Sequence, residues 1–175
     1  DDETLAAYQE ADLIVINGAG FEEWIGKVTL PQDRIVDTAE PLEGHLITLE
    51  DKFVHSHGPG HTHTHGGIDG HTWLDPVGAK TQAGQIGEAL ARRYPKRQGT
   101  FEAGFAALAA DLDALHLRHE ELAPAVRAHF LLASHPAYNY VARRYGWRQK
   151  YFHLDPETMP DEETLGKIKA AADEH

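Results

Sequence analysis

Short apolar runs alternate with helical segments at the start of the chain. The apolar run at residues 13–16, closed by a glycine turn, predicts a buried strand after a helix over residues 1–10. A short helix over residues 21–28 and a strand over residues 34–37 continue the alternation. Because parallel strands buried on both faces give such unbroken apolar runs, the pattern predicts an α/β fold.

The second half of the chain follows the same plan after two longer helices. Asp75 can cap a helix that Pro76 opens and that runs to about residue 93. Apolar residues at mostly helical spacing predict a helix of about six turns over residues 100–122. The remaining elements are predicted to be strands over 129–134 and 149–154 and helices over 137–145 and 161–173.

The segment between these two parts is unusually rich in histidine. The chain has 13 histidines in 175 residues, and five of them lie in a glycine-rich stretch, residues 55–67, which is predicted to be a low-complexity loop. Alternating histidines in such a loop can bring several neutral imidazoles to one zinc, copper or nickel ion. A pH-sensitive linker is the alternative interpretation. The five histidines are His55, His57, His61, His63 and His65.

Two other histidines occupy places typical of ligands. His71 lies where the predicted loop meets the helix that Pro76 opens, and His135 follows a predicted strand directly. Open α/β sheets bind ligands at the carboxyl ends of their strands. Each residue taken alone could equally be a hydrogen-bonded structural histidine.

Composition narrows the chemistry further. The formal net charge of −12 and the scattered lysines and arginines exclude a nucleic-acid partner. Without cysteine, imidazole and carboxylate are the strong metal-binding groups that remain. The longest apolar run is far shorter than the roughly 20 residues that cross a bilayer.

The motif GHTWLDP at residues 70–76 and the motif SHPAY at residues 134–138 resemble those of the metal-specific solute-binding proteins of ABC transporters, in the zinc and manganese cluster. The order of segments is similar as well, with ADLIVINGAGFEEW at residues 11–24 before a histidine-rich loop of the zinc type. This resemblance runs essentially from end to end. It implies that His71 and His135 are metal ligands.

The resemblance also implies an architecture and a role. We expect two Rossmann-like α/β lobes joined by a long rigid helix, with residues 1–99 in the first lobe, 100–122 in the linking helix and 123–175 in the second. Both lobes are expected to be incomplete, because a first-lobe strand and the last second-lobe strands of the family lie outside these residues. The implied role is capture of zinc outside the cytoplasm, in the periplasm or another extracytoplasmic place, and its delivery to an ABC permease.

Two imidazoles do not complete a zinc site, which normally has four ligands. The candidates for the others are Asp69, His153, a loop histidine such as His65, water, or a residue from a second copy of the chain. Nitrogen ligands favour Zn²⁺ over Mn²⁺, while Cu²⁺ and Ni²⁺ remain chemically compatible.

Two other functions compete with capture for transport. A stand-alone zinc buffer or chaperone would use only the histidine-rich loop. A zinc hydrolase would need an open coordination position and a nearby base, but the HLRHE segment at residues 116–120 lacks the spacing of His-Glu-x-x-His. We therefore predict a protein that is not an enzyme.

Overall fold

The computed structural model describes residues 2–56 and 62–175, with the backbone alone for residues 50–56 and 62–66. Its longer elements begin with one helix and four strands, continue with two long helices, and then alternate between strand and helix. They are α1 (Asp2–Glu10), β1 (Ile14–Ile16), β2 (Ile35–Asp37), β3 (Thr48–Ser56), β4 (Thr62–Ile68), α2 (Pro76–Arg93), α3 (Gln98–Arg127), β5 (Phe130–Ala133), α4 (Asn139–Tyr145), β6 (Arg148–Tyr151) and α5 (Glu162–Asp173).

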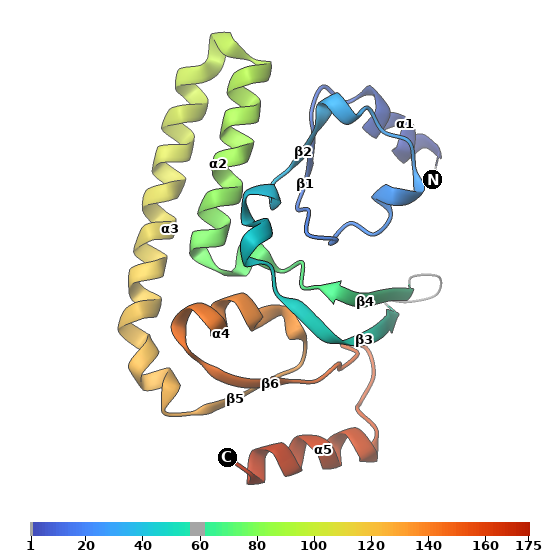
Figure 1. Ribbon diagram of the computed structural model, residues 1–175, viewed down its shortest axis with the longest axis vertical. Helices are drawn as coiled ribbons and strands as arrows, with labels where there is room; N and C mark the ends of the chain where they lie inside the picture. Colours follow the sequence, from blue (N-terminus) through green and yellow to red (C-terminus); the bar gives the residue numbers. More distant parts are fainter. Residues whose placement is uncertain (1, 57–61) are drawn as a thin grey trace.

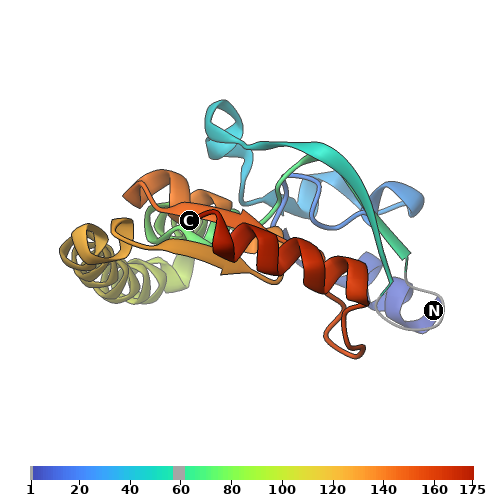
Figure 2. The ribbon, with the colours of Figure 1, turned by 90° about the horizontal axis from the view of Figure 1, so that it is seen from below.

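Within these residues the strands form three two-stranded sheets. β1 and β2 pair in parallel, with Ile14 opposite Ile35, and β5 and β6 pair in parallel, with Phe130 opposite Arg148. β3 and β4 form an antiparallel hairpin between the two parallel pairs in Figure 1. α2 and α3 run side by side along one flank of the molecule, and α5 lies beyond the β5–β6 pair (Figures 1 and 2). The α/β prediction is confirmed.

The helix that begins after Asp75 forms as its sequence predicts. The Asp75 side chain accepts a hydrogen bond of 3.2 Å from the backbone N–H of Val77, and Pro76 occupies the first helical position. This cap satisfies one of the backbone donors that a helix leaves unpaired at its start. The helix α2 then ends at Arg93, as predicted.

The long helix α3 extends further at both ends than the predicted range of 100–122. It begins at Gln98 and ends at Arg127, with Pro124 inside it. Proline lacks one backbone donor, but it stands in the last turns, where only a short piece of helix remains to be disturbed. The C-terminal closure uses the backbone N–H of Ala128, which donates to Ala125 and Val126.

The prediction of a helix over residues 21–28 is wrong. Residues 21–28 form no α-helix and contain only a single 3-10 turn, η1 (Ile25–Lys27). The Glu22 carboxylate instead accepts hydrogen bonds of 2.7 and 3.1 Å from the backbone N–H groups of Asn17 and Gly18, which holds this segment in a turn.

The parallel strands are also not buried on both faces. Ile14 is 3% exposed, whereas Val15 is 44% exposed and Leu132 of β5 is 39% exposed. Alternate residues of a strand point to opposite faces, so each pair has one covered and one open face in this structure.

The prediction of a loop over residues 55–67 is wrong for most of that range. β3 and β4 carry strand pairing through it, with His55 opposite His63 and Phe53 opposite His65. Threonines between the histidines favour extended backbone, which an argument from low complexity overlooks. His57 and His61 lie outside the described residues.

Among the residues that are described, no helix is long and apolar enough to span a bilayer.

Candidate metal centre

His71 and His135 come together from opposite halves of the molecule. His71 stands just before η4 (Thr72–Leu74), and His135 stands between β5 and η6 (Pro136–Tyr138). Their ring centres are 5.1 Å apart and the ring planes lie at 82°. Two imidazoles bound to one tetrahedral zinc ion, with Zn–N near about 2.0–2.1 Å, have ring centres about 5 Å apart. The pair is therefore spaced as one shared ion requires.

Asp69 fixes the orientation of the His71 ring. Its Oδ1 lies 2.7 Å from His71 Nδ1 and also accepts from the His71 backbone N–H at 3.0 Å. The Asp69 side chain is 0% exposed and the His71 side chain only 13% exposed. Since a carboxylate accepts but does not donate, this contact places the imidazole proton on Nδ1 and leaves the Nε2 lone pair for a metal.

The first lobe holds the His71 segment through a buried polar network. Asn17, which follows β1, donates from Nδ2 to the carbonyl of Gly70 at 2.8 Å. Gln82 of α2 accepts from the Thr72 hydroxyl at 3.0 Å and donates to Asn17 Oδ1 at 2.9 Å and to Thr38 at 2.8 Å. Thr72, Gln82 and Thr38 are all buried, so each bond replaces water that is excluded from the site.

Residues of α4 hold the segment that contains His71 from the other side. The Tyr140 hydroxyl donates to the carbonyl of Asp69 at 2.6 Å and accepts from the backbone N–H of Ile47 at 3.1 Å. Burial raises the pKa of Tyr140, so its hydroxyl keeps the proton that it donates. The Arg144 guanidinium forms two hydrogen bonds with the nearly buried Asp75 carboxylate, and these bonds raise the pKa of Arg144.

The aromatic rings of Phe21 and Trp73 lie beside the ring of His71. Phe21 and Trp73 have ring centres 5.7 and 5.4 Å from that of His71. They contact each other edge to face at 4.8 Å and are 40% and 37% exposed. The imidazole thus has two aromatic neighbours in addition to the Asp69 carboxylate.

The auxiliary candidates differ in where they lie. The His153 ring centre is 6.5 Å from that of His135, which places a third imidazole beside the pair. Asp69 binds protein donors through both oxygens and so supports His71 instead of standing open beside it. Over residues 2–49 and 67–175, whose side chains are described, no group of three or more histidine and carboxylate side chains is arranged to hold an ion. The side chains of His55, His57, His61, His63 and His65 lie outside that description.

Sequence reasoning missed the residues that support the site. Asn17, Gln82, Asn139 and Arg144 were not singled out, because an isolated amide or arginine carries no spacing signal. Nor did it indicate the contact of His116 in α3, whose Nδ1 lies 3.0 Å from the hydroxyl of the buried Tyr145.

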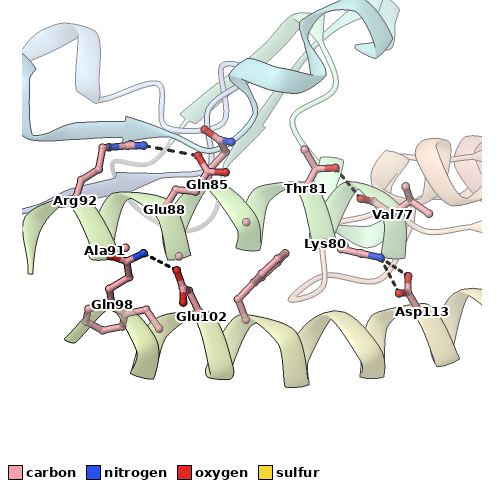
Figure 3. Close-up of a pocket in the computed structure, with 14 residues that line it drawn as sticks. Val77, Lys80, Thr81, Gln85, Glu88, Ala91, Arg92, Gln98, Glu102 and Asp113 are labelled. Carbon is pink, nitrogen blue, oxygen red and sulfur yellow. Dashed lines mark hydrogen bonds and ion pairs between the residues drawn. The ribbon is translucent and has the colours of Figure 1, made fainter. Parts of the chain in front are cut away.

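A separate groove of about 600 Å³ lies between α2 and α3 (Figure 3). Phe101 and Phe105 of α3 and the small residues Gly84 and Gly87 of α2 contribute its apolar lining. Lys80 bridges one end by hydrogen bonds of 2.8 and 2.7 Å to Asp113. None of its lining residues belongs to the His71 and His135 segments.

Comparison with known proteins gives a consistent result over nearly the whole chain. The family model for zinc-uptake complex component A, periplasmic (ZnuA), matches residues 2–175. The zinc-binding lipoprotein AdcA of Streptococcus pneumoniae serotype 4 is 29% identical over 170 residues, which cover 94% of this chain and 33% of AdcA. The high-affinity zinc uptake system protein ZnuA of Bacillus subtilis is 27% identical over 183 residues, which cover 98% of this chain and 54% of that protein.

Solved structures show the same fold. A crystal structure of ZnuA matches with a TM-score of 0.75 and 25% identity, covering 99% of this chain and 63% of that one. The metal-dependent lipoprotein YcdH from Bacillus subtilis matches with a TM-score of 0.77 and 24% identity, covering 100% and 61%. The chain therefore spans less than two thirds of the length of these relatives.

Proposed function

Because this chain belongs to the ZnuA family, the periplasmic component A of zinc-uptake complexes, we propose that it captures a zinc ion as cargo between His71 and His135. The family consists of metal-binding solute-binding proteins and not enzymes, so the zinc hydrolase alternative is withdrawn. The observation that carries the proposal is the 5.1 Å separation of the two rings. That distance is compatible with two ligands of one tetrahedral ion.

The surrounding contacts support a binding role for this pair. The Asp69 carboxylate holds His71 Nδ1, so the ring presents a defined nitrogen to an ion. An imidazole donor set favours zinc over manganese, which prefers oxygen. The His153 ring centre lies 6.5 Å from that of His135, and we propose His153 as an auxiliary ligand.

The cellular role follows from the family and its members. We propose that the ion is held outside the cytoplasm, between a first lobe of residues 1–99 and a second lobe of residues 123–175 that the linking helix joins. From there it is passed to an ABC permease. The family is that of the periplasmic component A of zinc-uptake complexes, and the similar protein AdcA is a zinc-binding lipoprotein. Protonated imidazole cannot bind a metal, so affinity falls as the pH falls through the histidine range.

The proposal is tested by titrating zinc calorimetrically into the native chain and three variants. The first variant combines His71→Ala with His135→Ala, and its matched control combines His45→Ala with His129→Ala, which changes two exposed histidines away from the pair. The third variant replaces the histidine cluster by threonine, at His55, His57, His61, His63 and His65.

We expect the tightest zinc site to disappear from the His71 and His135 variant and to persist in the other two. If only the threonine variant lost binding, the chain would be a zinc buffer that uses the β3–β4 histidines, and capture between the lobes would be wrong. A manganese titration of the native chain measures the metal preference, with weaker binding than zinc expected.

A further inference from the structure

Asn139, the first residue of α4, lies between the two histidine segments. We infer that it is a positioning residue of the metal site: it aligns the Asp69 carboxylate that fixes the His71 ring, and thereby ties ion affinity to the packing of the two lobes. The inference rests on the proposed function, because it assigns to Asn139 a role in zinc capture.

The amide of Asn139 is held in one orientation by three partners. Its Nδ2 donates to Asp69 Oδ2 and to the carbonyl of Pro136, both at 2.9 Å. Its Oδ1 accepts from Nε2 of Gln149, also at 2.9 Å. Turning the amide over would set its oxygen against a carboxylate and a carbonyl, so the donor must face Asp69.

This one side chain reaches both histidines through their neighbours. Pro136 follows His135 directly, and Asp69 accepts from Nδ1 of His71 at 2.7 Å. The donors that bind a side chain with 0% exposure hold that side chain in one direction. Among the residues whose side chains are described, Asn139 supplies the hydrogen bond to Asp69 Oδ2, and without that bond the carboxylate is held less firmly towards His71.

The chain of bonds also crosses between the halves of the molecule. Gln149 lies on β6 and Asn139 on α4, whereas Asp69 and His71 follow β4. Any displacement of α4 from residues 69–71 breaks the bond from Asn139 to Asp69 and loosens the ring. The position of α4 and the orientation of the ligand are therefore linked through the bond from Asn139 to the Asp69 carboxylate, which acts beside the bond from Tyr140 to the Asp69 carbonyl.

The test measures the His71 tautomer by NMR in the metal-free chain, at a pH where the ring is neutral, and the zinc affinity by calorimetry. Asn139→Leu keeps a similar volume but removes the donor. Val141→Ala is the matched control, because Val141 is a buried residue of the same helix that packs on Ala123 and Tyr145. Its loss weakens the docking of α4 without removing a bond to Asp69.

We expect His71 of the native chain to carry its proton on Nδ1. Asn139→Leu should populate the Nε2-protonated form and weaken zinc binding about tenfold, while Val141→Ala changes neither. Gln149→Met, which leaves the bond from Asn139 to Asp69 in place, should act in the same direction by a smaller factor. This variant also decides the question if Asn139→Leu does not fold.

The inference is overturned if Asn139→Leu and Gln149→Met keep the native tautomer and affinity, or if Val141→Ala shifts both to the same extent. Failure of the proposed function gives a different pattern. In that case the native chain and its His71→Ala variant would bind zinc equally, while the tautomer comparison in the metal-free chain would still decide the role of Asn139.

Discussion

Two regions that flank His71 are held together by opposite kinds of interaction. Beyond the carboxyl ends of β1 and β2, the buried amide of Gln82 joins Asn17, Thr38 and Thr72 through directed hydrogen bonds. Where α3 meets α4, the buried residues Ala123, Val141 and Tyr145 form an apolar cluster.

The difference teaches how each region contributes to the site. A hydrogen-bond network fixes directions, because each partner must lie at a set angle and distance. An apolar cluster supplies stability that depends mainly on the area buried. Residues 69–75 touch both regions, since Asn17 donates to Gly70 on one side and Leu74 packs against the apolar cluster on the other. The hydrogen-bond network of Gln82 therefore sets the orientation of the segment that contains His71, and the apolar cluster contributes much of the stability that holds this segment in place.

Asp75→Ala is expected to have the largest effect, because Asp75 serves both regions. It caps α2 and pairs with Arg144 of α4, and its side chain is only 7% exposed. The Arg144 side chain is 35% exposed, so its unpaired charge would be partly solvated; loss of this pair and loss of the helix cap together cost about 3 kcal/mol. Urea unfolding of the variant measures this loss of unfolding free energy.

The matched control for that change is Asp113→Ala. Asp113 pairs with Lys80, but the two side chains are 53% and 38% exposed. Exposed pairs contribute about 0–1 kcal/mol, so this variant should stay close to the native stability. Equal losses for the two variants would show that residues 69–75 do not depend on the Asp75 pair.

Gln82→Leu disrupts the hydrogen-bond network and leaves the residues of the apolar cluster unchanged. It removes the partner of the Thr72 hydroxyl and of Asn17 Oδ1 in a buried place, while Thr38 keeps its bond to the carbonyl of Asn17, and this costs about 2 kcal/mol of unfolding free energy. Zinc affinity should fall as well, because Thr72 follows His71 directly.

Val141→Ala gives the comparison for Gln82→Leu from the apolar side. Removing the two methyl groups should cost about 1.5 kcal/mol, yet zinc affinity should be unchanged. Calorimetry and urea unfolding on both variants provide the measurement. If Val141→Ala weakened zinc binding as much as Gln82→Leu, the contrast between directing and anchoring regions would fail.

The sequence predicted those elements whose signals are local. The cap at Asp75, the proline at position 76 and the apolar run of β1 each act within a few residues, and all three formed where expected. The pairing of His71 with His135 came from resemblance, because separate motifs carry no information about their distance in space.

What the sequence could not predict depends on contacts between distant residues. The bond from Asn139 to Asp69 joins positions 70 residues apart, and neither residue type indicates the other. The segment after β1 was predicted to be helical from its composition, but the Glu22 carboxylate turns back to the backbone of Asn17. In the histidine-rich segment, pairing between β3 and β4 produces strands where a loop was predicted. Pairing of that kind leaves no periodic pattern in the local sequence.

Tyr145→Phe is expected to have the smallest effect at neutral pH and tests the apolar region alone. Burial raises the pKa of Tyr145 to about 12, from an ordinary value of about 10. Between these two pH values the unfolded chain releases a proton that the folded chain keeps. The stabilisation is therefore complete below about pH 10 and is lost as the pH rises towards about 12.

The phenylalanine variant keeps the buried ring but has no proton to lose. Near pH 7 it should differ from the native chain by about 1 kcal/mol, through loss of the 3.0 Å contact with Nδ1 of His116. Urea unfolding from pH 9 to pH 12 should then show a shallower alkaline decline for Tyr145→Phe than for the native chain, since the other titrating groups are common to both. Parallel declines would mean that the hydroxyl of Tyr145 reaches water, and that the contact between α3 and α4 is not the closed apolar cluster on which the comparison with Gln82 depends.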